Sequence, residues 1–246
     1  MTSAPRVLVL AGRGRYEDPW HDMAATSHRV AEVLSAPTVD GTDDLGSPAY
    51  RVSVRGAFPD ALDDLDHAGD DVDLVVVNTS SGRPDPGFDG DDARWAGFHE
   101  RLRAWADAGR PVLGLHQAAN TFADAADWER VLGGRWVDGT SMHPDIGEAG
   151  FTLTGADHDL TGLLRATTSG VVTAFDERYS WLRVAESSTV ILTQRHDGVD
   201  HPVVWVSGAP GVRCVYDALG HGARSYDSPS RQALLRAEAA WLLAGT

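Results

Sequence analysis

Apolar residues in the first half of the chain form short unbroken runs that alternate with amphipathic stretches. These runs predict β-strands at residues 6–11, 50–55, 73–78 and 111–115. Between them, apolar side chains spaced three and four positions apart predict helices at residues 22–34 and 91–108. Strands that are apolar throughout need cover on both faces. The pattern therefore indicates a mostly parallel sheet with helices on both faces.

The second half consists of short extended segments joined by turns. Strands are expected at residues 151–154, 171–175, 189–194, 201–207 and 211–216, and a closing helix at 230–243. Turn sequences separate the last three strands, which predicts an antiparallel meander. Because no low-complexity linker interrupts the pattern, we expect a single domain, residues 1–246, whose C-terminal half is an antiparallel extension of the sheet.

Composition excludes several chemistries. All 21 basic residues of the 246 are Arg, and Cys214 is the only cysteine. Without Lys there is no Schiff-base lysine and no lysine-dependent phosphate loop. One cysteine makes neither an internal disulfide nor a thiolate-rich metal site.

The net charge of −15 argues against binding to nucleic acid or to an anionic membrane. No apolar run approaches the length of a membrane span, so a cytoplasmic protein is expected. Residues 40–92 hold 14 Asp and only three Arg. This segment is either a solvated acidic face or a docking surface for a basic partner.

The segment PVLGLHQAANTF at residues 111–122 is the strongest local signal for chemistry. His116 directly follows a buried strand, and a helix is expected over 117–126. This strand–sharp turn–helix layout is that of a nucleophile elbow, with His in place of the nucleophile. Helix N–H groups disfavour positive charge, so we expect a neutral imidazole that acts as general base, hydrogen-bond donor or metal ligand. The alternative is a structural His in a turn.

Other titratable residues lie in loops or at strand ends, one per loop. Each is a candidate for function or for an ordinary structural role: His21, His143, His201, His221 and the Asp176–Glu177 pair with Tyr179. The glycines beside His221 let the backbone approach a ligand closely. No HExxH or H-x-H pair occurs. We therefore expect no cofactor, while a divalent metal would require these scattered side chains to converge in space.

Four ordered motifs together resemble the trehalose-utilisation, or ThuA-like, family. They are residues 114–144, FDERY at 175–179, HPVVW at 201–205 and LGHGARSYD at 219–227. The resemblance implies the flavodoxin-like fold of class I glutamine amidotransferases. Family motif positions carry over onto His21, His116, Gln117, His143, Glu177, Tyr179, His201 and His221.

The resemblance also implies a role in sugar utilisation. In true glutaminases of this superfamily the elbow residue is Cys. Here it is His116, and Cys214 lies in a late strand, so glutaminase activity should be absent.

The leading hypothesis is an enzyme that isomerises or hydrolyses a sugar or keto-sugar by His-based acid–base chemistry. The expected catalytic residues are His116, His143, His221 and Glu177, and the expected substrate contacts are His21, Gln117, Tyr179, His201 and Trp20. One alternative is a non-catalytic sugar-binding or regulatory module. Another is a metal-dependent hydrolase. Twofold dimers are the commonest oligomers, so a homodimer is the assembly to test.

Overall fold

The structure is a computed structural model that describes residues 4–37, 49–65 and 72–244. A nine-stranded sheet forms its centre, in the order β2-β1-β3-β4-β11-β10-β9-β6-β7. Its strands are β1 (Arg6–Ala11), β2 (Arg51–Gly56), β3 (Leu74–Asn78), β4 (Val112–Leu115), β6 (Gly147–Leu153), β7 (Val171–Asp176), β9 (Thr189–His196), β10 (Val199–Val206) and β11 (Cys214–Asp217). The short strands β5 (Gly134–Arg135) and β8 (Arg183–Val184) pair separately.

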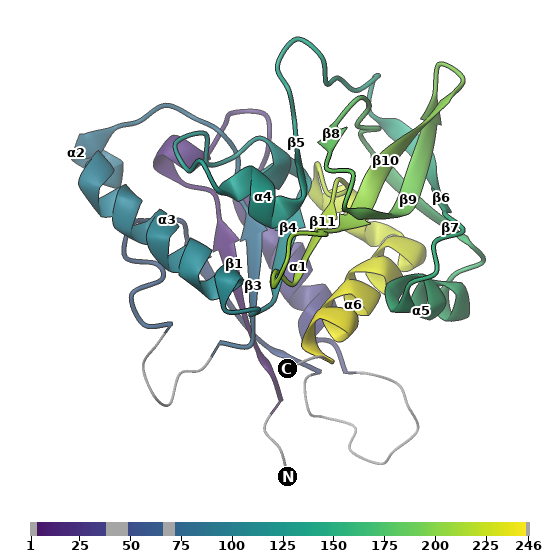
Figure 1. The fold of residues 1–246 in the computed structure, drawn as a ribbon, viewed down its shortest axis with the longest axis horizontal. Helices are drawn as coiled ribbons and strands as arrows, with labels where there is room; N and C mark the ends of the chain where they lie inside the picture. The colour runs from purple at the N-terminus through teal and green to yellow at the C-terminus, as the bar shows by residue number, and fades with distance from the viewer. Residues whose placement is uncertain (1–3, 38–48, 66–71, 245–246) are drawn as a thin grey trace.

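The sheet has a parallel half and an antiparallel half, which lie at the centre and at the right of Figure 1. Strands β2, β1, β3, β4 and β11 are parallel neighbours. From β11 onward every pairing is antiparallel. The predicted fold class and meander are thus confirmed. Strand β11 joins the halves, because it pairs with β10 on one side and with β4 on the other.

Helices cover both faces of the parallel half. The α-helices are α1 (Met23–Ser35), α2 (Pro86–Asp89), α3 (Asp92–Asp107), α4 (Trp128–Leu132), α5 (Asp159–Thr167) and α6 (Pro229–Leu243). Figure 1 shows α1 and α6 on one side of the central strands and α3 and α4 on the other. Strands β3, β4 and β11 are buried along their whole length, as two-sided cover requires.

Side-chain caps begin the long helices where the apolar period begins. The carboxylates of Asp22 and Asp91 accept from the third residue beyond, at the starts of α1 and α3. Ser228 caps α6 and Pro229 occupies its first turn. Each such cap contributes about 1 kcal/mol to the stability of the helix. The predicted and observed starts of these helices agree to within two residues, because capping residues stand directly before the apolar period.

The helix expected over residues 117–126 is wrong. A single 3₁₀ turn, η2 (His116–Ala119), follows β4, and a loop then leads to α4. The chain leaves the helical path because Phe122, at φ 52°, turns its ring into the core against Trp128. Further 3₁₀ turns are η1 (Gly14–Tyr16) and η3 (Ala223–Asp227).

The acidic segment 40–92 lies partly outside the described residues. In its described part, several carboxylates pair within the molecule. Asp89 is buried and accepts from the backbone N of Arg15 at 2.8 Å, and Asp64 pairs with Arg55. This part of the segment is therefore not simply a solvated face. Among the described helices, none combines the length and apolar character needed to cross a membrane.

Candidate active site

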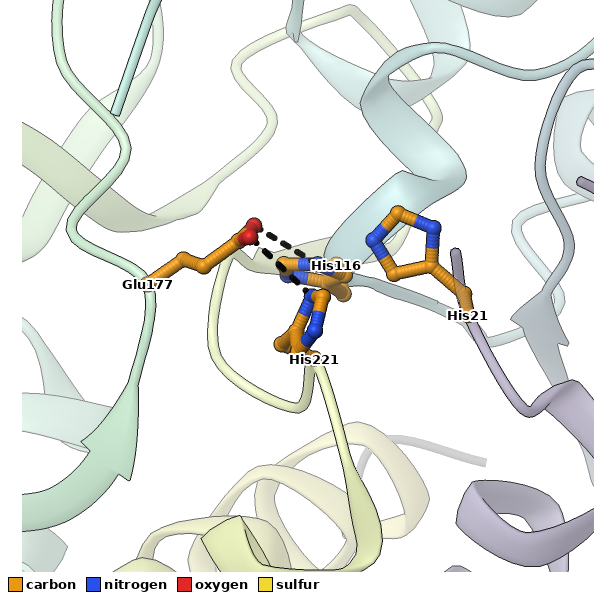
Figure 2. Close-up of side chains that lie close together, drawn as sticks. All are labelled: His21, His116, Glu177 and His221. Carbon is orange, nitrogen blue, oxygen red and sulfur yellow. Dashed lines mark ion pairs between the residues drawn. The ribbon is translucent and has the colours of Figure 1, made fainter. Parts of the chain in front are cut away.

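Four titratable side chains from four separate loops converge at one edge of the sheet. His21 follows β1, His116 follows β4, Glu177 follows β7 and His221 follows β11. Each offers one nitrogen or oxygen donor atom, and these atoms all lie within 4.8 Å of one another. Figure 2 shows the Glu177 carboxylate facing His116 and His221, with the His21 ring on the opposite side. We call these four residues the His–Glu cluster.

The location of the cluster follows from the topology. The carboxyl ends of parallel strands meet at one edge, and ligands bind there near the point where strand order reverses. Here the order reverses between β1 and β3, and the loops after β1, β4 and β11 all reach this edge. Residues far apart in sequence therefore become neighbours: the His116 ring lies 5.0 Å from that of His21 and 5.6 Å from that of His221, centroid to centroid.

His116 occupies a sharp turn, as the elbow pattern predicts. Its φ of 45° lies in the left-handed region, which few residues other than glycine adopt. Two contacts with β11 and its following loop hold this turn. His116 Nδ1 donates to the carbonyl of Ala218 at 2.7 Å, and the Tyr216 hydroxyl donates to the His116 carbonyl at 2.8 Å. Because Nδ1 carries the proton, Nε2 presents its lone pair to the cluster.

Asp18 holds the His21 loop in place. Its carboxylate accepts from His21 Nδ1 at 2.8 Å, from the backbone N of Trp20 and of His21, and from the hydroxyl of Ser80. Burial acts to raise the pKa of Asp18, but the hydrogen bonds from His21 and Ser80 outweigh it and lower the pKa to about 2. Burial lowers the pKa of His21. A neutral His21 thus donates from Nδ1 and turns the lone pair of Nε2 toward the cluster.

Glu177 is the acidic centre of the cluster. Its carboxylate lies 3.2 Å from His221 Nδ1 and 3.5 Å from His116 Nε2. Burial acts to raise the pKa of Glu177, but the two imidazoles outweigh it and hold the pKa well below its ordinary value. In turn Glu177 raises the pKa of His221. The buried carboxylate is therefore an anion that attracts cationic partners.

Asp176 sets the backbone around Glu177 and His221. It is fully buried and accepts from the backbone N of Glu177, Gly220 and His221. Gly220 has a φ of 119°, and a Cβ there would lie 2.6 Å from the Tyr226 hydroxyl, so only glycine fits. The loop after β11 is thus closely tied to the end of β7.

Three further predicted residues surround the cluster. The Tyr179 hydroxyl donates to His116 Nε2 at 3.0 Å and accepts from Gln117 Nε2 at 2.6 Å. Gln117 Nε2 also lies 3.3 Å from His21 Nε2. His143 stacks on the Tyr179 ring, and its Nε2 lies 3.5 Å from the Glu177 carboxylate. Because the His143 side chain is 38% exposed, it is the part of this group most open to solvent.

Two predicted residues lie apart from these contacts. His201 is buried on β10, where its ring packs on Trp181 and its Nδ1 accepts from the Trp181 backbone. Trp20 adjoins His21 in sequence but is 77% exposed. It lines a hollow of about 440 Å³ together with Asp18 and His21.

Sequence reasoning missed Asp18 and Ser80. Both lie at the edge formed by the carboxyl ends of the parallel strands: Asp18 is three residues before His21, and Ser80 comes two residues after β3. Position alone was thus a usable signal for Ser80. The contact between Asp18 and Ser80 depends on the neighbouring placement of β1 and β3.

Comparisons with known proteins agree with this architecture. The family model described as ThuA, trehalose utilisation, matches residues 70–242. The chain belongs to the ThuA family. This membership confirms the resemblance carried by the four motifs, and it indicates a role in carbohydrate utilisation. A search of curated protein sequences finds no match for this ThuA chain.

Solved structures share the ThuA chain's fold at low identity. A ThuA-like protein from Parabacteroides merdae is 16% identical, covering 100% of this chain and 91% of that one, with a TM-score of 0.71. One from Bacteroides uniformis is 12% identical, covering 98% and 91%, with a TM-score of 0.67. A glutamine amidotransferase from Thermotoga maritima is 12% identical, covering 98% and 99%, with a TM-score of 0.52. These matches confirm the glutamine amidotransferase-like fold.

Proposed function

We propose that this ThuA protein is an enzyme that acts on a sugar or keto-sugar, with the His–Glu cluster as its catalytic centre. The convergence of His21, His116, Glu177 and His221 carries the proposal. Burying an ionised carboxylate among imidazoles is unfavourable for folding unless strong partners compensate. Groups with shifted pKa values that meet at the ligand-binding edge of such a sheet are typical of active sites.

The arrangement supports proton transfer at a sugar carbon or oxygen. Isomerisation next to a carbonyl, or hydrolysis, needs a base and an acid with unlike proton affinities within reach of one substrate. The cluster combines an anionic carboxylate with imidazoles whose pKa values move in opposite directions, downward at His21 and upward at His221. His143, at the solvent side of the cluster, would be the first imidazole that an entering substrate meets.

The surroundings suit a carbohydrate ligand. The hollow of about 440 Å³ beside the His21 loop falls within the size range of small-molecule sites, about 300–1,000 Å³. Trp20 offers an exposed aromatic face for a sugar ring. Gln117, whose amide contacts Tyr179 and lies 3.3 Å from His21 Nε2, would supply a polar group for its hydroxyls on the cluster side of His21.

The direct test is to incubate the purified protein with 3-keto-glucosides and with trehalose and to follow products by NMR. We expect enzyme-dependent loss of at least one substrate, because acid and base groups already face one another. Calorimetry with the same sugars serves as the control for binding. Binding without product over long incubation would favour the sugar-binding module instead, and the absence of both would contradict the proposal.

We also infer that the protein has no glutaminase activity. His116 occupies the elbow, and Cys214 is fully buried in β11, where burial raises the pKa of its thiol far above the ordinary value. A buried neutral thiol is not a nucleophile. Incubation with glutamine should release no glutamate above the rate without protein. Release that disappears in Cys214→Ser would show this inference to be wrong.

A further inference from the structure

We propose that His21, His116, Glu177 and His221 together bind one divalent transition-metal ion. The four side chains come from separate loops, and their donor atoms lie within 4.8 Å of one another. A role for the ion in turnover rests on the proposed function, whereas its binding does not.

The two best-oriented imidazoles already have the geometry of metal ligands. His116 donates from Nδ1 to the Ala218 carbonyl, and His21 donates from Nδ1 to the Asp18 carboxylate. Metal-bound imidazoles in proteins typically donate the other ring N–H to a carbonyl or carboxylate, which fixes the tautomer and the orientation of the ring. Both Nε2 lone pairs are thereby turned into the cluster. A bound ion would replace the contacts that they make in this structure, from the Tyr179 hydroxyl to His116 and from Gln117 Nε2 to His21.

Glu177 and His221 present buried polar atoms that lack hydrogen-bond partners. Glu177 Oε2 and His221 Nδ1 are both buried in this way. The Glu177 side chain is 9% exposed, and its Oε2 lies 3.5 Å from His116 Nε2. A cation placed between the Glu177 carboxylate and the Nε2 lone pair of His116 would interact favourably with both. Buried polar atoms are nearly always paired in proteins, and one cation within the cluster would pair with both of these atoms.

The donor set selects the class of ion. Three imidazoles and one carboxylate suit Zn²⁺, Fe²⁺, Co²⁺ or Ni²⁺, whereas Mg²⁺ and Ca²⁺ prefer oxygen ligands. Around Zn²⁺, with bonds of about 2.0–2.1 Å, tetrahedral donors lie about 3.4 Å apart. Donor atoms up to 4.8 Å apart must therefore approach by up to about 1.4 Å on binding, which side-chain rotations achieve. A bound ion would supply a Lewis acid to a sugar carbonyl or to water.

The test uses tag-free protein that has been stripped with a chelator and titrated with Zn²⁺ and, separately, Mg²⁺ by calorimetry. We expect one Zn²⁺ per chain and no comparable binding of Mg²⁺. Glu177→Gln and His21→Gln should each weaken Zn²⁺ binding by at least about 100-fold, and Asp18→Asn by about 10- to 100-fold through loss of the partner that orients His21. The matched control is His28→Gln, since His28 is an exposed imidazole on α1.

Two further readouts keep the proposal falsifiable. The visible spectrum of the Co²⁺-loaded protein reports ligation directly and needs no variant, and circular dichroism shows whether each variant is folded. Failure of folded wild-type protein to bind Zn²⁺, or equal binding by His28→Gln and Glu177→Gln, would overturn the proposal. Zn²⁺ binding without sugar turnover would overturn only the proposed function. Sugar turnover by protein that binds no metal would overturn only the metal site.

Discussion

His116→Asn is expected to lower kcat on a keto-sugar substrate by about 100- to 10,000-fold, the usual contribution of a positioned acid–base group. The imidazole is lost from the centre of the cluster, where it contacts Tyr179 and lies 3.5 Å from Glu177. Asparagine tolerates the left-handed φ of 45° better than most residues, so the turn should persist. The contact from Tyr216 uses the backbone carbonyl and also remains.

The measurement is steady-state kinetics together with thermal unfolding of each protein. His28→Asn removes an imidazole that is 72% exposed on α1 and should leave kcat unchanged. If His116→Asn turned over substrate at the wild-type rate, His116 would not be a catalytic residue. A large fall in Tm would mean that kcat is lost because the variant is partly unfolded. His116→Gly then serves as the second variant, because glycine also adopts this φ.

Arg231→Met is expected to destabilise the protein by about 3–5 kcal/mol, lowering Tm on the order of 10 °C for a chain of this size. Arg231 and Asp217 are both fully buried, and their charged atoms lie 2.8 Å apart. Arg231 also donates to the Leu219 carbonyl, two residues before His221. Removing the guanidinium leaves Asp217 as an uncompensated buried charge beneath this loop.

The double variant Arg231→Met/Asp217→Asn should regain part of the lost stability, because it removes both charges. Urea unfolding measures the free energy of unfolding of the wild type and of each variant. A double variant no more stable than Arg231→Met would show that the packing of Arg231, and not its charge, is what matters. Arg195→Met is the matched control, because it removes a guanidinium from an exposed pair with Asp200 and should change stability little.

Burial raises the pKa of Glu238 well above its ordinary value. At a pH above the ordinary Glu pKa, Glu238 is therefore still protonated in the folded state but ionised in the unfolded state. The free energy of unfolding of the wild type consequently falls as pH rises above the ordinary Glu pKa. Glu238→Gln removes this dependence, so its stability relative to the wild type should increase from pH 5 to pH 8. A constant difference across that range would contradict a protonated Glu238.

Much of the fold was predictable because local pattern determines local structure. The continuous apolar runs of β1, β3 and β4 demand burial, and the caps at Asp22, Asp91 and Ser228 coincide with the onset of helical periodicity. Where the local signal is weak, prediction failed. Helix α5 was not predicted: it has three buried residues and begins at Asp159 after His158, which is not a typical N-cap residue. The false helix after His116 arose because periodicity does not show where Phe122 packs.

The sequence indicated which loops carry candidate site residues, but it did not indicate which of their side chains contact one another. The pattern assigned His21, His116 and His221 to separate loops, and the sheet order brings these loops to one edge. Nothing in the spacing distinguishes His201, which packs on Trp181, from His221, which faces Glu177. His221 lies between two glycines and His201 precedes a proline at a strand, but neither local pattern identifies the side chains that each ring contacts in the folded protein.

By itself, the sequence determined the parallel half of the fold, the antiparallel meander and the elbow at His116, since periodicity, turns and caps act over a few residues. The tertiary structure decided which scattered side chains meet. Because β11 lies beside β4, the Ala218 carbonyl reaches His116 and orients its lone pair. Because Asp176 ties the end of β7 to the loop after β11, Glu177 faces His221. Such contacts depend on strand order, a property of the whole chain that no local pattern contains.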